Sequence, residues 1–351
     1  MLTDIFAYRY KDAPIWPEYS ETERRLLNQA FGIVKDALPY YKPDGKVNKD
    51  NEQKWKSLHD KLCRELGVSE LSKRFYAYQQ TTALGANAVS GFFSWEHVCE
   101  QFVVGPFSGD MTADQFIKER LSFVELGLRF RGEEVARLNE NLPNEIFEAK
   151  RRESMPRSSL RIPGSAVDGI KARNASLNAA YNDQVNELNE RFRRAGVPLN
   201  YHNGFVQLSR DEVVEAQIAK PFWDIVSDRE WENVDIDMKE ALDRRDSNSK
   251  DPALFAAKAL ESAIKIISDQ KGWTRGTEQG AAQYIDNLIS KANGSFLDSW
   301  EGTMLKDYFR QVRNTVMHGP GSEPMPTLSL EQTDWAIEAA MSWVKTLVKR
   351  I

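Results

Sequence analysis

Apolar residues recur every three or four positions along much of the chain, the spacing of a helix that packs on one face. In "YSETERRLLNQAFGIVKDAL", Ser20 and Glu23 have the spacing of a capping box, so a helix is predicted over 20–38. The stretch "DNEQKWKSLHDKLCRELG" shows the same periodicity, and Gly67 is the type of residue at which a helix ends. The pattern predicts an N-terminal part built mostly of helices.

The same part also contains signals for one long helix and two small hairpins. A periodic segment that begins near Thr112 predicts a long helix, which Pro143 is expected to end or kink. The segments "RFYAYQQTT" and "VSGFFSW" are the strands of one predicted hairpin. A second hairpin is predicted in "LNYHNGFVQLS", with its turn at Asn203-Gly204. Between the two hairpins, a further helix is predicted over 174–195.

Residues 150–173 differ from their neighbours because they combine Pro156, Pro163 and Gly164 with seven lysines and arginines. Proline and glycine interrupt regular structure, so we expect a basic, irregular connector. Such a connector is either a solvated linker or an arm that contacts RNA phosphates. The side chains that would make these contacts are Arg151, Arg152, Arg157 and Arg161.

The clearest domain boundary is predicted near residue 248. Small, polar and charged residues gather over 243–251, and Pro252 follows at a position typical of helix starts. After it, four segments with one apolar stripe each are joined by short links, which predicts an up-and-down four-helix bundle. We therefore expect a mainly α protein, with an N-terminal domain over 1–247 and a C-terminal domain over 248–351.

The composition excludes several classes of protein. The net charge is −5, so any contact with nucleic acid must come from a local basic patch. Two cysteines without CxxC spacing argue against a cysteine-based zinc site and favour a reducing compartment. No signal peptide, membrane span, phosphate-binding glycine loop or HExxH pair is recognisable. We expect a cytoplasmic protein that uses no metal ion or cofactor.

Candidate chemistry lies in "RNTVMHGPG", at the end of the third predicted bundle helix. Asn314 and His318 are four residues apart and share a helix face, while Arg313 lies at the edge of the apolar stripe. An imidazole can accept or donate the protons of RNA cleavage, and a guanidinium can stabilise charge on the phosphorus. Asparagine can orient the histidine or hold the ribose. The group could therefore cleave RNA without a metal ion.

Two basic residues precede this group on the same predicted helix. Arg310 lies three residues before Arg313, and Lys306 lies one turn further back, so both are candidate contacts for RNA. The alternative is structural, because the dipole at a helix C-terminus favours arginine and histidine in the last turn. The spacing alone leaves both interpretations open.

Two parts of the chain resemble known families. "DPALFAAKALESAIKII" followed by "FRQVRNTVMHGPG" is similar to the C-terminal domain of AbiJ-type abortive-infection proteins, which resembles the HEPN superfamily. "MLTDIFAYRYKDAPIW" resembles the N-terminal domain that accompanies it. The resemblance implies a metal-independent endoribonuclease of phage defence, or a toxin, that acts as a homodimer with two motifs face to face. It implies Arg313, Asn314 and His318 as catalytic residues.

A second function stays open on the same residues. A non-catalytic bundle could bind a nucleotide, RNA or a partner protein, with Arg313 and His318 used for recognition or capping. A toxin held inactive by a separate antitoxin is a further option. In the ribonuclease hypothesis, the products carry 2′,3′-cyclic phosphate and 5′-hydroxyl ends, and the N-terminal domain senses an infection signal or restrains the nuclease.

Overall fold

The fold is mainly α-helical, as the sequence predicts, with two small two-stranded sheets among the described residues. The computed structural model describes residues 4–82, 85–154, 165–209, 211–247, 249–314 and 328–351. The chain divides into two units, unit 1 (Met1–Val206) and unit 2 (Gln207–Ile351). None of the described helices combines the length and the apolar character needed to cross a membrane.

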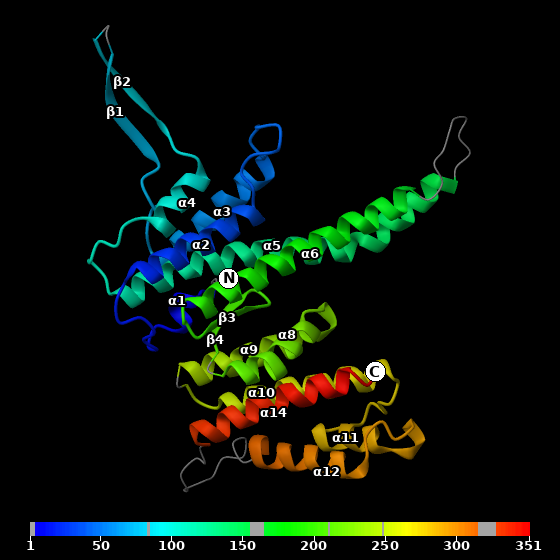
Figure 1. Ribbon diagram of the computed structural model, residues 1–351. Helices are drawn as coiled ribbons and strands as arrows, with labels where there is room; N and C mark the ends of the chain where they lie inside the picture. The colour runs from blue at the N-terminus through cyan, green and yellow to red at the C-terminus, as the bar shows by residue number, and fades with distance from the viewer. Residues whose placement is uncertain (1–3, 83–84, 155–164, 210, 248, 315–327) are drawn as a thin grey trace. The chain divides into compact units, whose positions relative to one another are not determined.

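Unit 1 contains a set of helices and most of both β-hairpins. Its elements in chain order are α1 (Phe6–Arg9), α2 (Glu21–Ala37), α3 (Lys49–Leu66), β1 (Phe75–Thr82), β2 (Gly85–Phe92), α4 (Trp95–Val104), α5 (Ala113–Ser154), α6 (Ser165–Arg194), β3 (Leu199–His202) and β4 (Phe205–Leu208). The long helix α5 contacts α1, α2, α3, α4 and α6, so it is the central element of the unit (Figure 1).

The first helices begin and end where their sequences predict. The Ser20 side chain accepts a hydrogen bond from the Thr22 amide, and the Glu23 carboxylate accepts one from the Ser20 amide at 2.8 Å. This capping box starts α2. Gly67 ends α3 with a φ of 70°, a left-handed conformation that glycine adopts without steric penalty. Both predicted helices are confirmed.

The long helix does not end at Pro143. α5 continues through this residue to Ser154, although proline donates no hydrogen bond to the carbonyl four residues earlier. Packing of α6 along α5 supports the helix on both sides of the proline. The basic connector was also predicted with wrong bounds, because 150–154 belong to α5 and 165–173 belong to α6.

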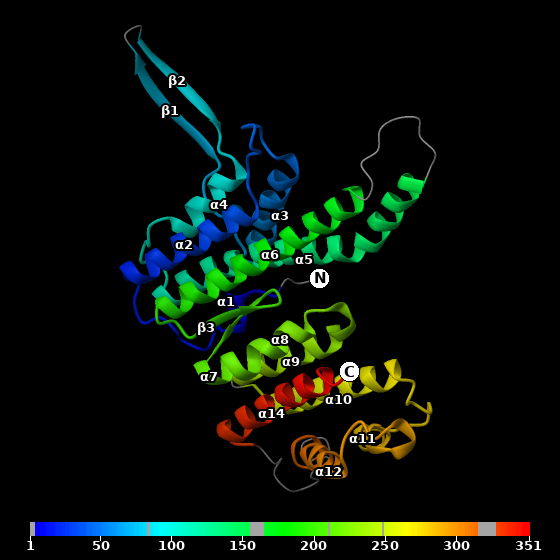
Figure 2. The same cartoon turned by 45° about the vertical axis from the view of Figure 1, so that its right-hand side comes forward.

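We call residues 139–154 of α5 and 165–178 of α6 the α5–α6 arm (Figure 2). Three asparagines join its two helices. The Asn174 and Asn178 amides both donate to the Asn139 side-chain oxygen, at 2.8 and 2.9 Å. The Asn139 amide donates in turn to the Asn178 side-chain oxygen at 2.9 Å. The arm is therefore held at this level by amide hydrogen bonds.

Both predicted hairpins are confirmed. β1 and β2 pair antiparallel, from Phe75 opposite Phe92 to Thr82 opposite Gly85. β3 and β4 form the second two-stranded sheet, and its turn residues Asn203 and Gly204 have φ angles of 43° and 91°. Two consecutive positive φ angles are typical of the tight turn that the Asn-Gly dipeptide favours.

A buried carboxylate connects three parts of unit 1. Glu125 on α5 is fully buried and is paired with Arg9 of α1 and with Arg129, whose Nη2 atom donates to it at 2.9 Å. It also accepts a hydrogen bond from the Val206 amide at 2.7 Å, while the Arg129 Nε atom donates to the Gly204 carbonyl at 2.8 Å. The two arginines balance the buried carboxylate, and these contacts tie α1 and the second hairpin to α5.

Apart from the last two residues of β4, the regular elements described in unit 2 are all helices. Its elements are α7 (Glu212–Val214), η1 (Glu215–Ala219), α8 (Lys220–Val226), η2 (Arg229–Trp231), α9 (Glu232–Asp246), α10 (Pro252–Gln270), α11 (Ala281–Ile289), η3 (Lys291–Asn293), α12 (Ser299–Tyr308), η4 (Phe309–Asn314) and α14 (Leu330–Val348). Of the short segments, η1 and η4 are π-helices, and η2 and η3 are 3₁₀-helices.

The four predicted C-terminal helices are present as α10, α11, α12 with η4, and α14. α10 is their centre and contacts α9, α11, α14 and η4. Its buried side is rich in alanine, which lets neighbouring helices approach closely. α11 and α12 also lie close, because a Cβ atom on Gly302 would come within 2.6 Å of the Ile289 side chain.

The structural division lies N-terminal to the boundary predicted near residue 248. α8 and α9 contribute Phe222, Trp223 and Met238 to the same buried cluster as α10 and α14. The four C-terminal helices thus bury part of their apolar surface against α8 and α9 as well as against each other. The polar stretch before Pro252 links α9 to α10 within unit 2.

We predict that Glu125→Ala lowers the stability of unit 1 by about 3 kcal/mol, because Arg129 loses its carboxylate and the buried Arg9 keeps only the half-exposed Asp4, at 3.3 Å. Hydrogen exchange of the α5 amides in the full chain measures this loss. The matched control is Glu148→Ala, which removes an exposed carboxylate paired with Arg151 and should change stability by less than about 0.5 kcal/mol. Equal protection in both variants would contradict the prediction.

Candidate functional site

Arg313, the first residue of the predicted motif, belongs to η4, which continues α12, and the start of α12 is firmly held. Asp298 and Glu301 form a capping box at the start of α12. Glu301 also accepts two hydrogen bonds from Arg350, at 2.7 and 3.0 Å. Further along, the Tyr308 hydroxyl donates to the Ala336 carbonyl on α14 at 2.8 Å, and burial raises the pKa of this phenol, which keeps it protonated. These contacts fix the helix that carries Arg313.

The motif begins inside a π-helix. Phe309–Asn314 form η4, in which the hydrogen bonds span five residues instead of four. Such wider turns occur often at functional sites. The two arginines of this segment have different environments, since 66% of the Arg310 side chain is exposed but only 23% of the Arg313 side chain. Arg313 thus lies at the edge of the buried stripe, as predicted.

A buried carboxylate on α10 holds Arg313. The Arg313 Nη1 atom lies 2.6 Å from Glu261 Oε2, and Glu261 is almost fully buried. The other carboxylate oxygen of Glu261 lies 3.0 Å from Lys265 Nζ, one helical turn along α10. The Arg313 Nε atom is buried and has no hydrogen-bond partner among the described residues. The guanidinium is therefore anchored through one nitrogen.

Glu261 and Lys265 are functional candidates that the motif search missed. Both belong to "AKALESAIK", where the apolar periodicity draws attention to the core residues around them. Glu261 can be recognised as a candidate in the sequence because it directly follows the core residue Leu260. An acidic residue at the edge of a buried stripe requires a cationic partner, and Arg313 is the cation that the structure places there.

The other two motif residues cannot be placed beside Arg313. The backbone of Asn314 ends η4, but its side chain lies outside the described residues. His318 also lies outside them, and so does Val316, the last residue of the predicted apolar stripe. The convergence of an arginine, an asparagine and a histidine therefore stays a prediction.

The two candidate RNA contacts on the motif helix are already in ion pairs. Lys306 Nζ lies 2.6 Å from Asp286 of α11, and Arg310 Nη2 lies 2.9 Å from Asp307. Both basic side chains are partly exposed, at 36% and 66%. Exposed pairs of this kind are weak, so either cation can exchange its carboxylate for a phosphate at little cost.

The remaining candidates belong to the α5–α6 arm of unit 1. Arg151 and Arg152 are exposed on the last turn of α5, whereas Arg157 and Arg161 lie outside the described residues. Arg151 lies 3.4 Å from Glu148. The arm holds a surface pocket of about 480 Å³ lined by Asn141, Asn144, Glu145, Glu148, Ala149, Arg152, Ile170 and Arg173.

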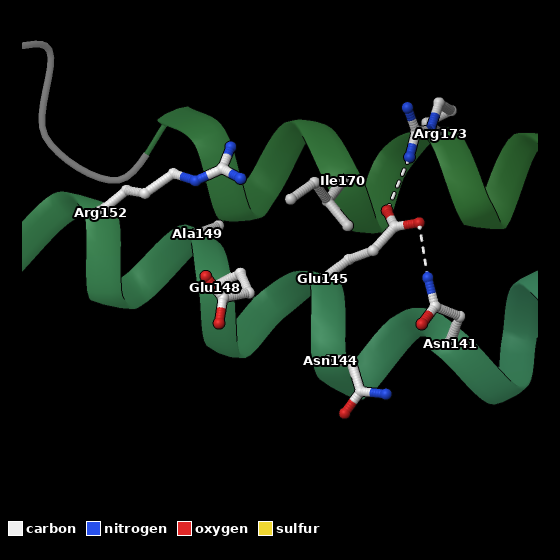
Figure 3. Close-up of a pocket in the computed structure, with 8 residues that line it drawn as sticks. All are labelled: Asn141, Asn144, Glu145, Glu148, Ala149, Arg152, Ile170 and Arg173. Atoms are coloured by element: carbon white, nitrogen blue, oxygen red, sulfur yellow. Dashed lines mark hydrogen bonds and ion pairs between the residues drawn. The ribbon is translucent and has the colours of Figure 1, made fainter.

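Acidic side chains offset part of the positive charge in this pocket. Figure 3 shows Glu145 between Asn141 and Arg173, whose Nη2 atom donates to it at 2.7 Å. Glu145 also accepts a hydrogen bond from the Asn141 amide at 3.3 Å. The pocket is consequently mixed in charge, and the cations at the end of α5, Arg152 in its lining and the neighbouring Arg151, are the better candidates for contacting RNA. Within the described residues, no cluster of three or more histidines, cysteines or acids could hold a metal ion.

Comparison with known proteins identifies a family for the larger part of the chain. Residues 4–224 match the AbiJ N-terminal domain 4 family. The matched range includes the Arg9–Glu125 pair, both hairpins and the α5–α6 arm, and it ends before α10 and the motif at Arg313. The predicted N-terminal resemblance is thereby confirmed. No curated protein and no solved structure matches the chain significantly.

We predict that Glu261 and Arg313 are energetically coupled. In a double-mutant cycle of Glu261→Ala and Arg313→Ala, the first change removes the carboxylate beside Arg313 and the second leaves the buried Glu261 with Lys265 alone, so the coupling should be about 1–3 kcal/mol. Hydrogen exchange of the α10 amides reports the stability of each variant. The same cycle on the exposed Asp286 and Lys306 should give at most about 1 kcal/mol. A larger coupling in the exposed pair would refute this assignment.

Proposed function

Because the chain belongs to the AbiJ N-terminal domain 4 family, and so is an abortive-infection protein of the AbiJ type, we propose that unit 2 is a metal-independent endoribonuclease. The proposed catalytic residues are Arg313, Asn314 and His318. The substrate is RNA, because the reaction uses the ribose 2′-hydroxyl as an internal nucleophile that DNA lacks.

Each residue has a distinct part in the proposed reaction. His318 removes the proton from the 2′-hydroxyl, and the 2′-oxygen attacks the adjacent phosphorus. The bond from phosphorus to the 5′-oxygen then breaks, and the histidine of a second copy supplies the proton for the leaving oxygen. Arg313 stabilises the charge that grows on the phosphoryl oxygens. The products carry a 2′,3′-cyclic phosphate and a 5′-hydroxyl, and Asn314 orients the histidine or the ribose.

The observation that carries this proposal is the anchoring of Arg313 of η4 by Glu261 of α10. A guanidinium presents five N–H donors in a fixed plane. One of its nitrogens is occupied by Glu261, and the buried Nε atom has no partner among the described residues. An arginine held in this way loses little conformational freedom when it binds a phosphate, which favours a positioned catalytic group.

The proposed active form is a homodimer through the C-terminal helices. Two copies of the motif in one cleft supply both a base and an acid for the same linkage, and they double the positive charge near the RNA backbone. Glu261 lowers this positive charge, because its carboxylate neutralises one arginine in each copy. The second cation beside Glu261, Lys265 at 3.0 Å, reduces that effect.

A non-catalytic role is the second candidate, and the same ion pair favours it. A partly buried arginine paired with a carboxylate is also a stable structural arrangement. In that case the helices of unit 2 bind RNA, a nucleotide or a partner such as an antitoxin without cleaving RNA. The products of a reaction with RNA distinguish the two functions.

We predict that His318→Ala reduces RNA cleavage by about 10²–10⁴-fold while secondary structure and dimer mass stay unchanged, because a general acid–base group is lost. The assay incubates the full chain with total cellular RNA in excess EDTA and identifies the termini of the fragments. The matched control is His97→Ala, which removes a partly exposed histidine on α4 of unit 1 and should keep full activity.

The outcomes separate the proposals. Loss of cleavage in the His318 variant, together with cyclic-phosphate ends in the unchanged chain, supports the ribonuclease. Undiminished cleavage by the His318 variant would contradict the ribonuclease proposal. A shift of intact RNA in a gel, without shorter fragments, supports the binding role instead.

A second prediction concerns the α5–α6 arm. If Arg151 and Arg152 contact phosphates, their double substitution by alanine weakens binding to all single-stranded RNAs and lowers the salt slope by about 1.4, at about 0.7 per contact. Fluorescence anisotropy in the His318→Ala background measures binding without cleavage. The control replaces Arg193 and Arg194, an exposed pair on α6 that binds Glu190, and should leave the slope unchanged. An equal change in both variants would show that only net charge matters.

A further inference from the structure

The β1–β2 hairpin differs in chemistry from the rest of the chain. Residues 75–95 contain no charged side chain, although charged residues make up 28% of the sequence. Phe75, Tyr78 and Phe92 are each more than half exposed. Figure 1 shows β1 and β2 extending from the helices of unit 1 as a ribbon of two strands. An uncharged, aromatic and exposed hairpin is unusual on a protein surface and indicates a contact surface.

Both edges of this ribbon present backbone groups that face away from the partner strand. The Phe93 amide donates to the Arg74 carbonyl at 2.9 Å, and Phe75 lies opposite Phe92, so the hydrogen-bonded pairs fall on even-numbered residues of β1. The odd-numbered residues, including Ala77, therefore direct their N–H and C=O groups away from β2. The same holds for Ser90, which lies opposite Ala77 on β2.

The described strands lack the features that normally protect an edge. Natural proteins block exposed edges with lysine, proline, bulges or a covering element. β1 and β2 contain no lysine or proline, and their register runs without a bulge. A hairpin of two strands alone is only marginally stable in water, whereas three or more strands form a stable sheet. The ribbon is therefore suited to gaining another strand.

The two edges are not equivalent. β1, "FYAYQQTT", consists of aromatic residues, threonine, glutamine and one alanine, and it contains no glycine. β2, "GANAVSGF", contains two glycines, which weaken a strand. At one of them, Gly91, a Cβ atom would come within 2.6 Å of the Tyr76 hydroxyl, so a larger residue there would have to displace the Tyr76 side chain. The strand with the stronger tendency to pair is β1.

We propose that the outer edge of β1 pairs with β1 of a second copy of this chain. Two identical strands that run antiparallel about a two-fold axis match every donor with an acceptor, and they join two ribbons into one four-stranded sheet. The lack of charge favours this occupant. Interfaces with a different protein commonly select it by complementary charge, which this surface does not offer, whereas two uncharged copies do not repel each other.

Proline substitutions test which edge is used. Ala77→Pro removes an outward N–H of β1, and Ser90→Pro removes the outward N–H opposite it on β2, so neither interrupts the bonds within the ribbon. Sedimentation velocity of the full chain over a range of concentrations measures the assembly. We expect the Ala77 variant to reach about half the mass of the unchanged chain, and the Ser90 variant to keep the full mass. Equal behaviour of the two variants would overturn the proposal.

A charge exchange at the exposed Gln79 tests whether the partner is a second copy. In the register that places Gln79 at the two-fold axis, Gln79→Lys alone and Gln79→Glu alone should each shift the chain toward half the mass, because like charges then meet across the axis. A mixture of the two should recover the full mass, because opposite charges then meet. Failure of the mixture to associate, or an unchanged chain that stays monomeric at all concentrations, would refute self-pairing.

The test of β1 pairing does not depend on whether unit 2 is a nuclease. If the helices of unit 2 also dimerise, about a two-fold axis of their own, the same variants fall from about four chains to two instead of from two to one. RNA cleavage by the β1 variants is measured in parallel. Intact cleavage with reduced mass supports β1 pairing apart from catalysis, whereas reduced cleavage with unchanged mass counts against β1 pairing.

Discussion

The fold of unit 1 depends on one buried carboxylate. Glu125 on α5 joins Arg9 and Arg129, and through them the N-terminal segment and the second hairpin, to the central helix. Removing three charges from water is unfavourable unless each finds a partner, so the chain must bring these distant segments together or leave a charge buried alone. The N-terminal stretch that carries Arg9 falls within the range that matches the family.

Unit 2 repeats this principle at the candidate site. α10 is nearly all apolar where it is buried, and Glu261 is the acidic residue on its buried side. Its partner Arg313 comes from η4, a helix with a wider turn. The carboxylate therefore fixes the orientation of the arginine, and the proposed chemistry rests on a group that is positioned before RNA arrives.

Local signals predicted most elements, and long-range contacts account for what was missed. The capping box at Ser20 and the Asn203-Gly204 turn are decided by neighbouring residues, so the sequence is enough to place them. The continuation of α5 through Pro143 depends on α6, which a local pattern does not contain. The same applies to Glu261, because its role depends on Arg313, which follows more than fifty residues later.

The asparagines of the α5–α6 arm have a consequence for its alignment. α5 has 42 residues and is about 60 Å long, so one end of the arm is remote from the core of unit 1. Long antiparallel helices with few apolar contacts can slide past each other by a turn. Such a slip would place Asn174 and Asn178 opposite other side chains and break their bonds to Asn139. The hydrogen bonds among Asn139, Asn174 and Asn178 thus fix the register of the two helices in the α5–α6 arm.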